Sequence, residues 1–193
     1  AQSTETSLAC PGTQVFTLTR LAASLDALLA ALPARPAATP AALCVALSGG
    51  LDSTLLLVAL SRLSGERRLA ARLRAIHIDH GLHPDSARWA EACRALATAC
   101  AVPCDDVRVA VPAGQGESPE AAARAARYAA LAARLQPGEV LLTAHHADEQ
   151  LETVLLQWLR GGGLRAIAGM PLLSRFGADA WHARPLLEFT RDE

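Results

Sequence analysis

Ser48-Gly49-Gly50-Leu51-Asp52-Ser53 is the string whose residue types and spacing point most directly to chemistry. It follows the apolar run 43–47 and precedes a helical pattern, so its two glycines stand at a strand-to-helix turn. Glycine lacks a Cβ atom, which lets backbone N–H groups approach an anion, and the start of a helix adds free donors. A bare pair of glycines would favour an ordinary capped turn, but the whole string favours a phosphate or pyrophosphate site. All six residues, Ser48 to Ser53, are predicted to contribute to it.

Two more strand-like runs end in histidines and carboxylates. One continues into Ile76-His77-Ile78-Asp79-His80, and the other into Thr143-Ala144-His145-His146-Ala147-Asp148. Taken alone, each is explained by helix capping and by acidic residues near a helix start. Parallel strands end at one edge of a sheet, however, so we expect these side chains to meet the glycine turn. The candidate general acids or bases are Asp79, His80, His145 and Asp148.

Asp52 needs a counter-ion if phosphates bind beside it, because two negative groups repel each other. Mg²⁺ is the cation that suits carboxylate and phosphate oxygens, and Asp148 is the candidate second ligand. Arg124 and Arg127 are three residues apart and share a helix face, which suits either a solvated surface or a grip on phosphate. Arg160 opens an Arg-Gly-Gly-Gly segment that suits either contact with a polynucleotide backbone or a helix end.

Alternating short apolar strands and longer helices must position these residues. Helices are predicted at about 18–32, 53–63, 86–100, 119–135 and 147–159, and strands at about 43–47, 73–79, 106–111 and 140–144. This alternation is typical of βαβ units. We therefore expect an α/β fold with a doubly wound parallel sheet, covered by helices on both faces.

The composition excludes several classes of protein. The chain has 193 residues, a net charge of −1, 51% hydrophobic residues and 19% charged ones, which argues against disorder. All 18 basic residues are arginine, so mechanisms that need a lysine of the chain, such as a Walker-type loop or a Schiff base, are excluded. The apolar stretches are too short to span a membrane. The five cysteines contain no CxxC pair, so we expect buried reduced thiols and a cytoplasmic protein.

Residues 14–193 are expected to form one domain, with residues 1–13 as a flexible tail. The last four residues, Thr190-Arg191-Asp192-Glu193, have the spacing of a capping box, as if a helix were beginning. This spacing suits a chain that is normally followed by further protein, and it suits a frayed terminus equally well.

The Ser48–Ser53 string resembles the PP-loop of the ATP pyrophosphatases, which cleave ATP between its α and β phosphates. The wider set of strings, residues 78–86, 117–128, 143–153, 160–163 and 184–187, resembles tRNA(Ile)-lysidine synthase over about residues 43–193. Small departures occur: Glu149 stands where the family commonly has aspartate, the family's RGSG is RGGG, and His83 replaces a residue that is often basic.

The resemblance implies ATP and Mg²⁺ as cofactors, and free L-lysine and tRNA(Ile) with a CAU anticodon as partners. The family joins lysine to C2 of the wobble cytidine through an adenylated intermediate, and its C-terminal tRNA-binding regions would lie outside this chain. Arg124, Arg127 and Arg160 would contact nucleotide or tRNA phosphate, no membrane would be involved, and a homodimer is left open. The alternatives are another PP-loop tRNA-modifying or amide-forming ligase, and a non-catalytic ATP-binding regulatory domain.

Overall fold

A computed structural model describes residues 15–33, 42–66, 69, 71–81, 83–110, 118–161 and 168–192. The expected tail, residues 1–13, lies outside this part. In chain order the elements are α1 (Leu18–Ala30), β1 (Ala42–Ala46), α2 (Leu51–Gly65), β2 (Arg72–Asp79), α3 (Ser86–Ala99), β3 (Cys104–Arg108), α4 (Pro119–Arg134), β4 (Val140–Leu142), α5 (Ala147–Leu159), β5 (Leu173–Phe176) and β6 (Ala180–Ala183).

The strands form one sheet in the order β3-β2-β1-β4-β6-β5, and every neighbouring pair is parallel except β5 with β6. The expected doubly wound α/β fold is confirmed. The chain moves outward from β1 through β2 to β3, then returns to the other side of β1 as β4. The strand order thus reverses between β1 and β4, which is where open sheets of this kind bind ligands. The β5–β6 hairpin has no counterpart in the sequence prediction.

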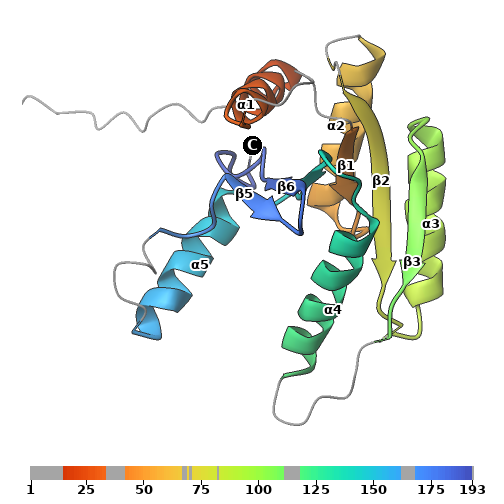
Figure 1. Ribbon diagram of the computed structural model, residues 1–193, viewed down its shortest axis with the longest axis vertical. Coiled ribbons are helices and arrows are strands. Elements are labelled where there is room, and N and C mark those ends of the chain that lie inside the picture. Colours follow the sequence, from red (N-terminus) through yellow and green to blue (C-terminus); the bar gives the residue numbers. More distant parts are fainter. Residues whose placement is uncertain are drawn as a thin grey trace, which may run out of the picture.

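Alternate residues of the central strands pack against helices on opposite faces. Leu43 and Val45 of β1 belong to the larger core with α1, α2 and α3, whereas Cys44 packs with Leu131 of α4. Figure 1 shows α4 on one side of the sheet and α2 and α3 on the other. This burial on both faces explains why the central strands are continuous apolar runs.

Side-chain caps mark the starts of two helices. The Thr17 hydroxyl accepts a hydrogen bond from the Arg20 N–H at 3.2 Å, and the Ser118 hydroxyl accepts one from the Ala121 N–H at 3.2 Å. Helices α2 and α3 have no side-chain cap, and the N-cap of α2 is Gly50. The first N–H groups of α2 therefore stay available to another acceptor.

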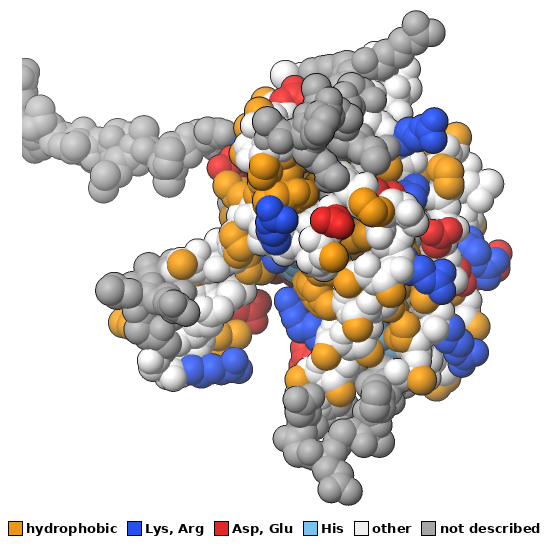
Figure 2. Space-filling model, viewed as in Figure 1, with side chains coloured by type: hydrophobic (Ala, Val, Ile, Leu, Met, Phe, Trp, Pro, Cys, Tyr) orange, Lys and Arg blue, Asp and Glu red, His pale blue; other side chains and the backbone are white. Residues whose placement is uncertain are grey.

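Helix α5 differs from the others because none of its residues is buried. Figure 2 shows it as a lobe beside the main body, with hydrophobic and charged side chains at its surface. Among the described residues, no helix combines the length and the apolar composition that crossing a bilayer requires.

The cysteines of the described residues are all free thiols, as expected, but Cys100 and Cys104 are only half-buried, contrary to the prediction of buried thiols. Cys44 and Cys93 are buried, and burial raises the pKa of the Cys44 thiol to about 12 and that of Cys93 to about 11. Cys10 lies outside the described residues.

Candidate functional site

A cavity of about 470 Å³ opens at the carboxyl ends of β1, β2 and β4. Five segments contribute polar side chains to its wall: the turn after β1, the end of β2, the start of α3, helix α4 and the segment from the end of β4 into α5. The predicted site residues that line it are Ser48, Gly50, Asp52, Ser53, Asp79, His80, Arg124, Arg127 and His145. The structure thus brings together most of the residues that the sequence singled out.

The turn after β1 is held in shape by its two serines. The Ser53 hydroxyl donates to the Gly50 carbonyl at 3.1 Å and accepts from the Ser48 N–H at 3.2 Å, and the Ser48 hydroxyl accepts from the Gly50 N–H at 3.3 Å. Gly49 has φ of +85°, a left-handed conformation that glycine adopts without strain. Leu51 begins α2 and is 72% exposed. The backbone N–H groups of this turn and of the uncapped first turn of α2 are therefore available to bind an anion.

The end of β2 contributes the Asp79 carboxylate, which a hydrogen bond holds in place, and it is followed by His80, whose Nδ1 atom has no hydrogen-bond partner among the described residues. The Asp79 carboxylate accepts a hydrogen bond from the Gly81 N–H at 2.8 Å, and this bond chiefly holds the pKa of Asp79 below its usual range. Burial, followed by the positive charge of Arg127, lowers the pKa of His80. The His80 Nδ1 atom is buried and has no hydrogen-bond partner among the described residues. A neutral His80 is therefore available to accept a proton.

The segment after β4 places His145 at the cavity and connects it to residues behind the wall. The Thr143 hydroxyl lies 2.8 Å from Nδ1 of His145 and 2.8 Å from Nε2 of His182. Burial, together with Arg184, lowers the pKa of His145 to about 4 and that of His182 to about 3. Both rings are therefore neutral near pH 7.

Helix α4 turns a basic face toward the cavity. Arg124 and Arg127 lie over the Tyr128 ring, with their guanidinium carbons 5.1 and 5.6 Å from its centroid. All three side chains line the cavity. The spacing of these arginines is compatible with either a solvated surface or phosphate binding, and their position at the cavity favours phosphate binding.

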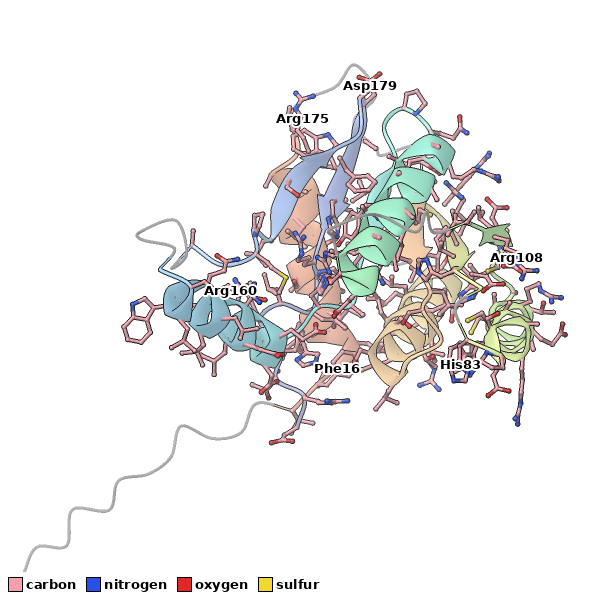
Figure 3. The ribbon with its side chains drawn as sticks, turned by 90° about the horizontal axis from the view of Figure 1, so that it is seen from below. Phe16, His83, Arg108, Arg160, Arg175 and Asp179 are labelled. Carbon is pink, nitrogen blue, oxygen red and sulfur yellow. The ribbon has the colours of Figure 1, made fainter. Side chains whose placement is uncertain are left out.

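Asp148 and Arg160 lie elsewhere. The Asp148 carboxylate accepts a hydrogen bond from the Arg191 N–H at 2.7 Å and contacts His146, and it is not among the residues that line the cavity. Arg160 is exposed at the end of α5, and Figure 3 shows it on the side of the molecule opposite to His83. Their predicted roles stay predictions that the cavity does not support.

The acidic residues at the cavity suit a magnesium ion only if a bound nucleotide supplies further oxygen atoms to the ion. Asp52 and Glu149 both line it, and carboxylate oxygens are ligands that Mg²⁺ prefers. Within the described part of the chain, no group of three or more His, Cys, Asp or Glu side chains is placed to hold a metal ion by itself. Mg²⁺ commonly takes its remaining ligands from substrate phosphates and water, so this set fits a nucleotide-bound ion.

Sequence reasoning missed several residues of the site. Glu149 lines the cavity one position after the predicted Asp148, and Trp89 and His83 stack at its rim with ring centroids 4.6 Å apart. His182 and Arg184 lie behind the wall. The only signal for Arg184 in the sequence is the Arg-Pro-Leu-Leu string, and none marked His182 or Trp89.

Comparison with known proteins agrees with this geometry. A family model described as a PP-loop domain matches residues 18–193. The chain is 55% identical over 149 residues to a tRNA(Ile)-lysidine synthase of Alkalilimnicola ehrlichii, and 47% identical over 148 residues to one of Methylococcus capsulatus. These alignments cover 77% and 76% of this chain and 33% of each relative. The chain therefore spans about a third of the length of the curated relatives it matches.

A solved structure shares the fold. It is the U34-tRNA thiolase NcsA of Methanococcus maripaludis with its 4Fe–4S cluster, with a TM-score of 0.65 and 14% sequence identity. The match covers 91% of this chain and 61% of that one. At this identity the likeness concerns the arrangement of helices and strands alone.

Proposed function

We propose, from the premise that this chain belongs to the PP-loop domain family, that it acts in the ATP-dependent attachment of free lysine to C2 of the wobble cytidine of tRNA(Ile). The observation that carries the proposal is the cavity, which is lined by the glycine turn, two arginines and three carboxylates. The relatives that are about half identical to this chain are named for this reaction. A cytoplasmic location, tRNA(Ile) with a CAU anticodon and free L-lysine are parts of the same proposal.

The turn after β1 is the proposed binding site for the ATP phosphates. Gly50 precedes an uncapped helix, and the serine hydroxyls hold the turn open rather than fill it. The positive end of the α2 dipole adds to this attraction. Arg124 and Arg127 would bind the same phosphates from helix α4, since guanidinium groups pair well with phosphate oxygens.

Asp52 and Glu149 would hold the magnesium ion, which neutralises phosphate charge when it is bound. Asp52 lies in the first turn of α2, next to the proposed phosphate site. Glu149 lies in the first turn of α5, and its carboxylate also accepts a hydrogen bond from the His146 N–H at 3.2 Å. The two carboxylates thus approach the cavity from the ends of β1 and β4.

The proposed reaction has two displacements. The C2 oxygen of the cytidine attacks the α-phosphorus of ATP, and pyrophosphate leaves. The lysine ε-amine then attacks C2, and AMP leaves with the oxygen. An amine must be neutral to attack, so a group of the chain has to accept a proton. His80 is the proposed acceptor, because it lines the cavity and its lowered pKa leaves the ring neutral.

Mass spectrometry of the nucleosides of tRNA(Ile) tests this function directly. After incubation with ATP, Mg²⁺ and lysine we expect lysidine in place of the wobble cytidine, and pyrophosphate release that needs both lysine and tRNA. The full-length relative from Alkalilimnicola ehrlichii is the positive control. Asp52→Ala should abolish pyrophosphate release while the far-UV circular dichroism stays unchanged; release at the wild-type rate would remove Asp52 from the site.

The same assay separates the alternatives. Pyrophosphate release stimulated by ammonia instead of lysine would indicate an amide-forming PP-loop ligase. ATP binding with no turnover under any of these conditions would indicate a regulatory domain. Either result would overturn the proposed reaction.

A further inference from the structure

Four side chains form a continuous hydrogen-bond series behind the cavity wall. Nη2 of Arg184 lies 3.3 Å from Nδ1 of His182, whose Nε2 lies 2.8 Å from the Thr143 hydroxyl. That hydroxyl lies 2.8 Å from Nδ1 of His145. Arg184 is 7% exposed and His182 is 2% exposed, whereas His145 lines the cavity. The series therefore connects a buried cation to a ring that faces the proposed substrate.

Counting protons along the series fixes the direction of every bond. The Arg184 guanidinium has only donors, so Nδ1 of His182 must be the acceptor. A neutral His182 then carries its proton on Nε2 and donates it to the Thr143 oxygen. The one hydrogen of the Thr143 hydroxyl is left to donate to Nδ1 of His145. A neutral His145 consequently carries its own proton on Nε2.

We propose that His145 is a fixed hydrogen-bond donor, whose Nε2–H serves an anionic oxygen of the bound nucleotide, and that Thr143, His182 and Arg184 are positioning residues that hold this tautomer. The assignment of the oxygen to a nucleotide phosphate rests on the proposed function, whereas the tautomer does not. The proposal removes His145 from the candidate bases, because its unprotonated nitrogen is already occupied by Thr143.

The surroundings of the ring agree with this role. Burial lowers the pKa of His145 to about 4, with contributions from Arg184, Arg124 and Arg127. The ring therefore stays neutral near pH 7 and keeps one donor. The three guanidinium groups that disfavour its protonation also favour an anion beside it. A neutral N–H donor in a positive environment suits the stabilisation of negative charge that develops on a leaving pyrophosphate.

Long-range ¹H–¹⁵N NMR of histidine-labelled protein tests the tautomer without substrate. We expect Nε2–H tautomers for His145 and His182, with their signals assigned from the His145→Gln and His182→Gln variants. Thr143→Val should change the nitrogen signals of His145, and Thr143→Ser should restore them. Thr98→Val is the matched control, because that hydroxyl bonds the Arg94 carbonyl on α3 and should leave His145 unaffected. An Nδ1–H or doubly protonated His145 in the wild type would overturn the proposal.

Pyrophosphate release supplies the second test. A glutamine amide can donate a hydrogen bond but cannot take up a proton, so His145→Gln should retain activity within about tenfold of wild type. His145→Ala should lose about 100- to 1,000-fold, the effect of deleting one donor to a developing oxyanion. Equal losses in both variants, with both folded, would contradict the donor role. A chain with the expected tautomer that forms no lysidine would contradict the proposed function alone.

Discussion

Gly49→Ala is the substitution that most directly tests the geometry of the glycine turn. Gly49 has φ of +85°, and a Cβ atom added there would lie 3.3 Å from Sγ of Cys93. Cys93 is 1% exposed and belongs to the larger core, so it cannot move aside freely. Alanine at this position would therefore both strain the backbone and press on α3.

The expected loss of stability is about 1–5 kcal/mol. A left-handed conformation costs an L-residue about 1–2 kcal/mol. Overpacking of a core contact typically adds about 1–3 kcal/mol, and the lower chain entropy of unfolded alanine offsets about 0.4–1 kcal/mol. For a chain of this size each kcal/mol lowers the midpoint of thermal unfolding by about 2–4 °C. A displaced turn would also lose an N–H contact to phosphate, which would weaken ATP binding by about 10- to 150-fold.

Urea unfolding and calorimetric titration with ATP measure the two effects. Gly65→Ala is the matched control: an added Cβ meets nothing within 4 Å there, so we expect no loss and a gain of up to about 1 kcal/mol. Cys93→Ala should reduce the cost of Gly49→Ala by about 0.5 kcal/mol or more, because it removes the contact and leaves the backbone strain. Equal effects of Gly49→Ala and Gly65→Ala would show that neither the left-handed backbone nor the Cys93 contact constrains this turn.

Three other predictions concern the rim, the buried histidines and the far edge of the sheet. Trp89 lines the cavity and is 48% exposed, so its ring is available for a base to stack on. In a fluorescence-polarisation titration, Trp89→Ala should weaken binding of an anticodon stem-loop by about 5- to 150-fold, and Trp89→Phe should weaken it less. Burial lowers the pKa of His182 to about 3. Below about pH 6.5 the unfolded chain therefore binds a proton at this histidine that the folded chain does not bind. The free energy of unfolding should consequently fall by up to about 1.4 kcal/mol for each pH unit below that value. The slope from urea unfolding should be smaller in His182→Gln, and equal slopes would contradict this assignment. Arg74→Met should lower the free energy of unfolding, measured in urea, by about 3–5 kcal/mol, because it leaves the buried Glu139 carboxylate without its ion-pair partner. The double variant Arg74→Met/Glu139→Leu should lower it by less, because no unpaired charge remains.

The central part of the fold could be predicted because both faces of its strands are buried. The predicted strand 43–47 and helix 147–159 agree with β1 and α5 within one residue. Strand β3 begins at Cys104 instead of the predicted 106, since it lies at the edge of the sheet and Cys104 is only half-buried, with Asp105 and Asp106 exposed. The β5–β6 hairpin was missed because its strands have four residues each and mix polar with apolar side chains, so neither strand has a clear period.

The site could be predicted only as far as single strand ends. Consecutive residues on a helix point about 100° apart, so Asp148 and Glu149 face different directions. The sequence does not reveal the phase of that helix, and the structure places Glu149 at the cavity. The partners of His145 were hidden for a different reason. Thr143 and His182 are 39 residues apart and meet only because β6 pairs with β4.

A net charge of −1 looks unsuited to the proposed binding of ATP and tRNA, but the charges are unevenly placed. At the amino edge of the sheet, Arg74 pairs with Glu139 at 2.6 Å and with Asp105 at 3.0 Å, so two carboxylates are neutralised far from the cavity. At the carboxyl edge, Arg124 and Arg127 line the cavity.

The absence of lysine also affects the charge at this cavity. Burial lowers the pKa of Arg184, yet a guanidinium starts so high that it keeps its charge at neutral pH, whereas a buried lysine often loses its proton. The positive field that disfavours protonation of His145 therefore does not depend on pH in the physiological range. Binding of phosphate at this edge should consequently weaken with rising salt concentration even though the chain as a whole is slightly acidic.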